Sequence, residues 1–195
     1  CFKVGAAVVP INFRLHPREF SYIINHSKSK VVLTSFEFLG DLVDIREDIP
    51  HANHLVSINQ AESGFLDYEV LLAVEADSFE DAEVEPDDVA WLFYTSGTTG
   101  SPKGAMLTHG NLTTNADTLI SYWGWRSDDV LLHALPIYHV HGLFVASHCV
   151  LLTGSSMIFL PRFDVDEVVH HLSSSTVVMG VPTFYTRLLQ SSRFT

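Results

Sequence analysis

The chain has 195 residues, of which 47% are hydrophobic and 17% charged, and its formal net charge is −12. A chain of this length and apolar content can bury a substantial core, as one domain or a large part of one. The negative charge argues against a nucleic-acid surface, because phosphate backbones attract basic proteins. Two cysteines make no disulfide framework and indicate a reducing compartment. The longest apolar stretch, residues 143–152, is too short to cross a bilayer.

Apolar runs typical of strands alternate along the chain with segments of helical periodicity. The predicted strands are residues 6–10, 31–34, 55–58, 89–94, 130–135, 156–160 and 177–180. The predicted helices are residues 17–27, 65–74, 109–123, 142–152, 164–173 and 182–190. In the first of these helices Phe20, Ile23 and Ile24 lie at helical spacing, and Pro17 suits a first turn. This alternation predicts an α/β fold with mostly parallel sheets covered by helices.

Acidic side chains are distributed unevenly and suggest where the chain divides. Residues 1–90 hold 17 acidic and 6 basic side chains, whereas the remainder holds 6 and 5. Eight of the acids fall in residues 75–88, and such a run is typical of a solvated linker. We therefore expect a first α/β portion over residues 1–74, an acidic linker over residues 75–88, and a portion over residues 89–195 that carries the functional site.

A stretch rich in glycine and hydroxyl side chains follows the predicted strand 89–94. Residues 94–104 read Tyr-Thr-Ser-Gly-Thr-Thr-Gly-Ser-Pro-Lys-Gly. Glycines let the backbone approach a ligand closely, and N–H groups, hydroxyls and a lysine are the donors that phosphate oxygens require. The spacing is not that of a Walker A loop, because Pro102 stands five residues after Gly97. The alternative is a flexible surface turn. We predict a phosphate-binding loop whose donors are Thr95, Ser96, Gly97, Thr98, Thr99, Gly100 and Lys103.

Two histidines, His139 and His141, follow the predicted strand 130–135. They have too few neighbouring ligands for a metal site, because only His133 and His148 lie nearby in the sequence and no cysteine or carboxylate cluster accompanies them. We predict no metal here. The imidazoles could serve the structure by bonding to backbone carbonyls.

Arg187 lies on the predicted helix that begins near Pro182, and it is one of only five basic residues after position 90. One interpretation is an ordinary exposed arginine. The other is a ligand for a carboxylate, which a guanidinium binds bidentately.

Three segments carry a resemblance to a known group of enzymes. Residues 94–112 resemble the signature loop of the adenylate-forming superfamily, which contains the acyl-CoA synthetases and other AMP-binding enzymes. Residues 135–144, Leu-Pro-Ile-Tyr-His-Val-His-Gly-Leu-Phe, and residues 178–189 resemble most closely its malonyl-CoA and methylmalonyl-CoA synthetase branch. Residues 5–15 resemble acyl-CoA synthetases more generally. The resemblance spans nearly the whole chain and is strongest from Asp88 onward.

This resemblance implies part of the large N-terminal domain of an adenylate-forming enzyme. It implies an ATP-dependent acid–thiol ligase that forms an acyl-adenylate and then an acyl-CoA, from malonate or methylmalonate. The loop from Thr95 to Lys103 would bind the β- and γ-phosphates of ATP, which is used with Mg²⁺. His139 would be catalytic, near the reacting carboxylate and the passage of coenzyme A. His141 and Arg187 would also contact the acyl substrate.

Two other functions stay open from the sequence. A medium- or long-chain fatty acyl-CoA synthetase would share everything up to the specificity pocket, and a non-catalytic nucleotide-binding or interaction domain could use the same scaffold. The chain starts at Cys1 and stops at Thr195 just after a predicted helix. We therefore expect a piece of a longer protein, inactive without its remainder. Its expected partners are a small carboxylic acid, ATP and coenzyme A, with no nucleic acid and no membrane-spanning segment, in the cytoplasm or an organelle matrix.

Overall fold

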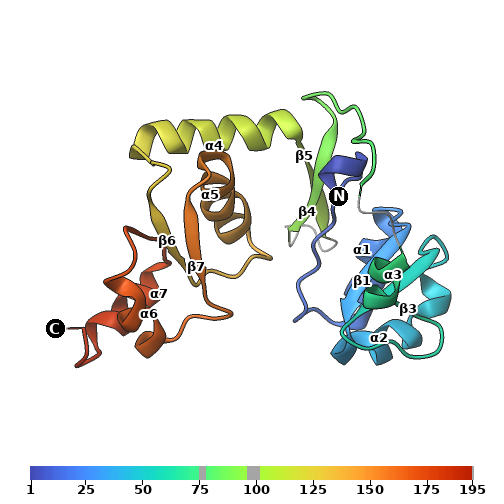
Figure 1. Ribbon diagram of the computed structural model, residues 1–195. Helices are drawn as coiled ribbons and strands as arrows, with labels where there is room; N and C mark the ends of the chain where they lie inside the picture. The colour runs from blue at the N-terminus through green and yellow to red at the C-terminus, as the bar shows by residue number, and fades with distance from the viewer. Residues whose placement is uncertain (75–77, 96–101, 195) are drawn as a thin grey trace. The chain divides into compact units, whose positions relative to one another are not determined.

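The computed structural model describes residues 1–74, 78–95 and 102–194. It divides into two compact units, Cys1–Thr108 and His109–Thr195, each of which is described by itself (Figure 1). The described part of the acidic stretch, residues 78–88, belongs to the first unit, where Ala82 N donates to Lys3 O over 2.7 Å. Within the described ranges, no helix has both the length and the hydropathy needed to cross a membrane.

The first unit contains a parallel sheet of order β1-β2-β3 and a separate antiparallel pair, β4-β5. Its elements in chain order are η1 (Phe2–Val4), α1 (Pro17–His26), β1 (Val31–Ser35), η2 (Phe36–Phe38), α2 (Leu39–Asp44), η3 (Arg46–Asp48), β2 (His54–Ile58), β3 (Leu66–Asp67), α3 (Tyr68–Val74), β4 (Val89–Thr95) and β5 (Lys103–Thr108). Residues from α1, α2, β2 and the turns beside them form one core, which consists of Phe20, Ile24, Leu42, Ile45, Ile49, Ala52 and Leu55.

Helix α1 begins at Pro17, as predicted, because His16 and Glu19 form a capping box at its first turn. The His16 ring accepts a hydrogen bond from Arg18 N at 3.2 Å, and His16 N donates to the Glu19 carboxylate at 2.8 Å. These bonds satisfy amides that the first helical turn leaves unpaired. The buried face of the helix, with Phe20 and Ile24, then packs into the core.

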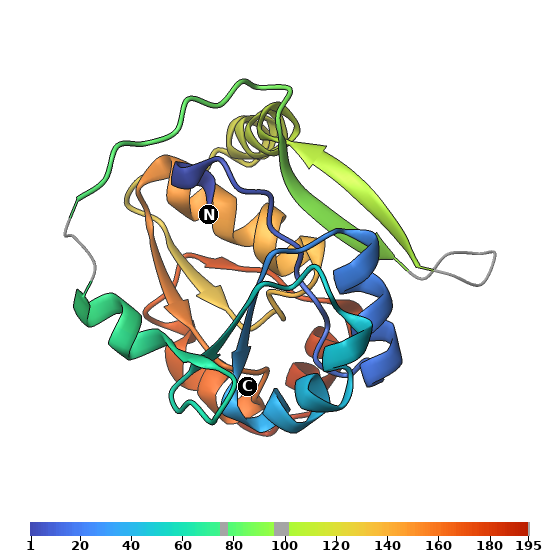
Figure 2. The ribbon, with the colours of Figure 1, turned by 90° about the vertical axis from the view of Figure 1, so that its right-hand side faces the viewer.

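Strand β5 was missed in the sequence analysis, and it changes the setting of the glycine-rich loop. It pairs antiparallel with β4, with Tyr94 opposite Gly104 and Thr95 opposite Lys103. Figure 2 shows the two strands as green and yellow-green arrows side by side. The run Lys-Gly-Ala-Met-Leu-Thr contains few β-branched residues, so its pairing with β4 rather than its own propensity makes it a strand. The loop therefore joins the two strands of a hairpin.

The predicted strand 6–10 is reduced to an isolated bridge between Val8 and Trp91. Val8 N donates to Ala90 O at 2.9 Å, and Leu92 N donates to Val8 O at the same distance. Pro10 lacks an amide hydrogen, so the ladder cannot continue through that residue. This segment adds to the edge of β4 without forming a strand of its own.

The second unit is a parallel sheet with helices packed on both faces (Figure 1). Its elements are α4 (His109–Trp123), β6 (Val130–His133), η4 (His141–Ser147), α5 (His148–Thr153), β7 (Ser156–Phe159), α6 (Val165–Leu172), β8 (Val177–Val178) and α7 (Pro182–Leu189). The sheet order is β7-β6-β8. Leu131 packs with α5 and Leu132 with α6 and α7, since successive residues of a strand face opposite sides. The predicted α/β architecture is confirmed.

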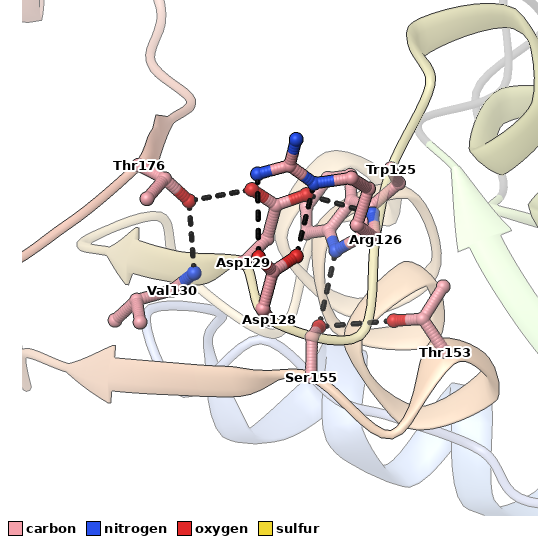
Figure 3. A network of polar contacts seen from close by, with 8 residues as sticks. All are labelled: Trp125, Arg126, Asp128, Asp129, Val130, Thr153, Ser155 and Thr176. Carbon is pink, nitrogen blue, oxygen red and sulfur yellow. Dashed lines mark hydrogen bonds and ion pairs between the residues drawn. The ribbon is translucent and has the colours of Figure 1, made fainter.

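A polar network holds the amino ends of β6 and β8 together (Figure 3). The Asp129 carboxylate accepts hydrogen bonds from Thr176 Oγ1 and Arg126 N, both at 2.7 Å, while Val130 N donates to Thr176 Oγ1 at 2.9 Å. The bond from Thr176, and then that from Arg126 N, lower the pKa of Asp129 below its ordinary value. The carboxylate therefore stabilises the fold above its unfolded pKa of about 3.9, and this contribution is lost as the pH falls through the lower folded pKa.

Candidate functional site

The stems of the predicted phosphate loop are the last residue of β4 and the first of β5. Thr95 and Lys103 are Cα partners across the hairpin, and both are exposed. The sequence placed Lys103 in the loop, but the residue belongs to strand β5. Pairing of β5 with β4 therefore holds its backbone. The other predicted donors lie outside the described residues: Ser96, Gly97, Thr98, Thr99 and Gly100.

Helix α1 contacts Tyr94 and Pro102, the residues next to the two stems, through one tyrosine and one histidine. Tyr22 Oη donates to Pro102 O at 3.1 Å, and His26 Nδ1 lies 2.7 Å from Tyr94 Oη. The rings of Tyr22 and His26 stack with centroids 5.4 Å apart. Burial, and to a smaller extent Tyr22, raise the pKa of the Tyr94 hydroxyl. Sequence reasoning missed this contact, because its partners lie 68 and 80 residues apart.

We expect Tyr22→Phe to loosen the start of β5 in the full-length protein. The change removes one hydrogen bond, worth about 0.5–1.5 kcal/mol, so amides of residues 103–105 should exchange with solvent roughly 2- to 13-fold faster. Hydrogen exchange followed by mass spectrometry measures this directly. Tyr122→Phe is the matched control, since Tyr122 is 84% exposed and should leave these amides unchanged. Equal exchange in wild type and Tyr22→Phe would contradict the contact.

The histidine segment turns back toward β6 directly after Pro136. His139 N donates to Pro136 O at 3.2 Å, and Leu143 N donates to His139 O at 3.0 Å. His139 is exposed, with its ring 4.6 Å from that of Tyr138, and His141 is half-buried at the start of η4. The structure records no hydrogen bond from either imidazole to the described part of the chain.

The predicted helix 142–152 is two helices, a π-helix, η4, followed by α5. π-helical turns are rare and occur frequently at functional sites. A Cβ on Gly142 would lie 2.5 Å from Pro136 O, so only glycine permits this close approach. The first turn of η4, which carries His141, therefore packs closely against the backbone of Pro136, three residues after β6. In the part of the chain that the structure describes, no three His, Cys, Asp or Glu side chains are grouped to hold a metal ion.

Arg187 is exposed on α7, and its guanidinium carbon lies over the ring of Phe163. Its Cζ is 4.9 Å from the ring centroid of Phe163, which stacks on Phe184 with centroids 3.9 Å apart. A guanidinium stacked in this way keeps its N–H edge free for a carboxylate. This geometry fits both interpretations of Arg187, as a surface side chain and as an acid ligand.

Topology relates Arg187 to the histidine segment within the second unit. β6 and β8 are parallel neighbours, so their carboxyl ends lie at the same edge of the sheet. The segment that contains His139 and His141 leaves β6 at that edge, and α7 with Arg187 follows β8 from the same edge. Ligands of open α/β sheets bind outside this edge. The phosphate-loop stems belong to the other unit.

Comparison with known proteins places these features in a larger context. A family model described as AMP-binding enzyme matches residues 1–195. The mitochondrial malonate–CoA ligase ACSF3 of Homo sapiens is 37% identical over 201 residues, which cover 95% of this chain and 32% of that protein. The crystal structure of ATP-bound MatB from Rhodopseudomonas palustris superposes with a TM-score of 0.84 at 42% identity, covering 96% of this chain and 36% of that one.

A ligase for a different acid has a similar fold. The anthranilate CoA ligase AuaEII, in complex with anthranoyl-AMP, superposes with a TM-score of 0.89 at 27% identity, over 98% of this chain and 38% of that one. The present chain therefore spans about one third of the length of these three relatives.

Proposed function

Because this chain belongs to the AMP-binding enzyme family, we propose that the protein containing it is an ATP-dependent acyl-CoA synthetase that acts on malonate or methylmalonate. The observation that carries the choice of acid is an available arginine, Arg187, at the same sheet edge as two available histidines. The 37% identity to a malonate–CoA ligase over 95% of the chain supports it. We propose the cytoplasm or an organelle matrix as its compartment.

The reaction joins a carboxylate to a thiol in two steps. A carboxylate oxygen of the acid attacks the α-phosphorus of ATP, and pyrophosphate leaves with the electron pair of the broken P–O bond. The thiol sulfur of coenzyme A then attacks the acyl carbon, loses its proton, and AMP leaves with the bridging oxygen. Phosphoryl transfer of this kind depends mainly on positioning and charge stabilisation.

The phosphate contacts are assigned to the hairpin loop. Thr95 and Lys103 stand side by side at its stems, so a hydroxyl and an ammonium group can meet the same phosphate oxygens. The remaining proposed donors are Ser96, Gly97, Thr98, Thr99 and Gly100. ATP is used with Mg²⁺, which keeps several waters and binds through phosphates and one or two carboxylates. Among the described residues no three side chains are grouped to hold that ion, so no residue of this chain is assigned to it.

The acid is assigned to the carboxyl edge of β6 and β8. A small dicarboxylate offers few apolar contacts, so its distal charge must carry much of the recognition. Arg187 would bind that charge with its free N–H edge, and His141 would donate a hydrogen bond to an acid oxygen. His139, the proposed catalytic residue, would face the carboxylate that reacts and the arriving thiol.

Exchange of radioactive pyrophosphate into ATP by the full-length protein tests this function. Pyrophosphate exchanges only if the adenylation step is reversible and the correct acid is present, so the assay separates the candidate acids. We expect exchange with malonate or methylmalonate and little with octanoate. Octanoate-dependent exchange would favour a fatty acyl-CoA synthetase, and no exchange with any acid would favour a non-catalytic nucleotide-binding domain.

A further inference from the structure

We propose that His133 is a positioning residue that holds the π-helical turn carrying His141 in place through a hydrogen bond to the Gly142 carbonyl. From the sequence, His133 was only a candidate metal ligand. The kinetic part of this inference rests on the proposed function, because it concerns residues assigned to the acid. The structural part does not depend on that assignment.

His133 is a polar side chain in the interior of the second unit. It ends β6, the central strand, and is 1% exposed. Its Cα partner on β7 is Phe159, and the two rings lie 5.0 Å apart. A buried polar group is costly unless it is hydrogen-bonded. The hydrogen bonds of the His133 imidazole therefore indicate its role.

The bonds of His133 converge on one carbonyl. Nε2 lies 2.9 Å from Gly142 O, and Ser147 Oγ donates to the same oxygen at 2.8 Å while lying 3.2 Å from Nε2. Nδ1 is buried and has no partner among the residues that the structure describes. The proton is therefore assigned to Nε2, because the other tautomer would bury an unpaired N–H and set two lone pairs against each other.

This arrangement joins the end of β6 to the first turn of η4. In a π-helix a carbonyl accepts from the amide five residues later, a wide turn with poorer contacts than an α-helix. The hydrogen bonds that His133 Nε2 and Ser147 Oγ donate to Gly142 O add stability to this turn. Gly142 also lies against Pro136 O, which accepts from His139 N. A shift of the turn would therefore displace His141, which precedes Gly142, and His139 with it.

Hydrogen exchange and kinetics of four variants of the full-length protein test the proposal. His133→Leu removes the donor and should speed exchange of the amides of residues 143–147 about 10-fold, while raising KM for the acid about 10-fold at unchanged KM for ATP. His133→Gln, whose amide nitrogen can take the place of Nε2, should restore most of both. Ser147→Ala should give a smaller effect in the same direction.

Leu131→Ala is the control for a merely structural role. Leu131 lies two residues earlier on β6 and is fully buried in the apolar core that also contains Ala146 of η4, so its truncation weakens packing and lowers the melting temperature while leaving both side-chain hydrogen bonds to Gly142 O in place. The proposal is overturned if Leu131→Ala raises the KM for the acid as much as His133→Leu does. It is also overturned if exchange at residues 143–147 is unchanged in His133→Leu. If His133→Leu fails to fold, Ser147→Ala and His133→Gln carry the same exchange comparison against Leu131→Ala.

Failure of the proposed function has a different signature. It shows in the wild-type protein as the absence of acid-dependent pyrophosphate exchange, before any variant is compared. The hydrogen-exchange result at the turn then still decides whether His133 holds Gly142.

Discussion

Arg187→Leu in the full-length protein is expected to lower kcat/KM for malonate by roughly two orders of magnitude or more, on the order of 3 kcal/mol. Arg187 is exposed with its guanidinium carbon over Phe163, and a guanidinium can bind the distal carboxylate of a small diacid bidentately. Activity with an acid that lacks a distal charge, such as butyrate, should hold or rise, because its apolar end makes no ion pair with the arginine and the leucine offers it apolar surface. The measurement is kcat/KM for both acids.

Two further variants show whether the effect belongs to this arginine. Arg187→Lys keeps the charge but loses the bidentate fork, so we expect it to recover only part of the malonate activity. Arg193→Leu removes the same charge from an exposed arginine of the same unit, which pairs with Asp166 at 3.1 Å, and should leave both acids unaffected. An equal loss on malonate and butyrate in Arg187→Leu would assign the residue to the fold or the nucleotide. No loss on either acid would make it an ordinary surface arginine.

Lys103→Ala is expected to slow adenylation while leaving the melting temperature nearly unchanged. Its side chain is exposed at the first residue of β5, so folding needs its backbone rather than its charge. A charged hydrogen bond is worth about 1.5–3 kcal/mol, which corresponds to roughly 10- to 150-fold in rate if it is expressed fully in the transition state. The rate of acid-dependent pyrophosphate exchange, the KM for ATP and the melting temperature are the measurements.

Lys30→Ala is the matched control for this change. Lys30 is exposed in the same unit, and its substitution removes the same charge. It lies away from the hairpin in sequence, just before β1. It should leave exchange and KM for ATP at the wild-type values. Normal ATP affinity and normal adenylation in Lys103→Ala would remove the lysine from the phosphate site.

The regular parts of the fold could be predicted because local patterns determine them. Helix α4 has the predicted bounds, His109–Trp123, and α1, α6 and α7 lie within one or two residues of prediction. Elements that depend on partners could not be predicted. Strand β5 is a strand because β4 pairs with it. Helix α2 has only six residues, too short to show a helical period, and is stabilised by burying Leu39 and Leu42.

The candidate site divides in the same way. The loop and the histidine segment were found because their residue types bear directly on phosphate and acid chemistry. The contact of Tyr22 with Pro102 spans 80 residues, and that of His133 with Gly142 depends on a π-helical turn. No periodicity or motif signals such contacts in one sequence, because packing brings the partners together. The supporting residues therefore came from the structure alone.

Oxygen transfer from the acid to AMP is the most direct test of the proposed chemistry. The full-length protein is incubated with ATP, coenzyme A and malonate whose carboxylates carry oxygen-18, and the AMP is analysed by mass spectrometry. If the acid attacks the α-phosphorus, the bridging oxygen stays with AMP when the thiol displaces it, so each AMP should carry one label and match one malonyl-CoA. Unlabelled AMP, or label found in inorganic phosphate, would contradict an acyl-adenylate.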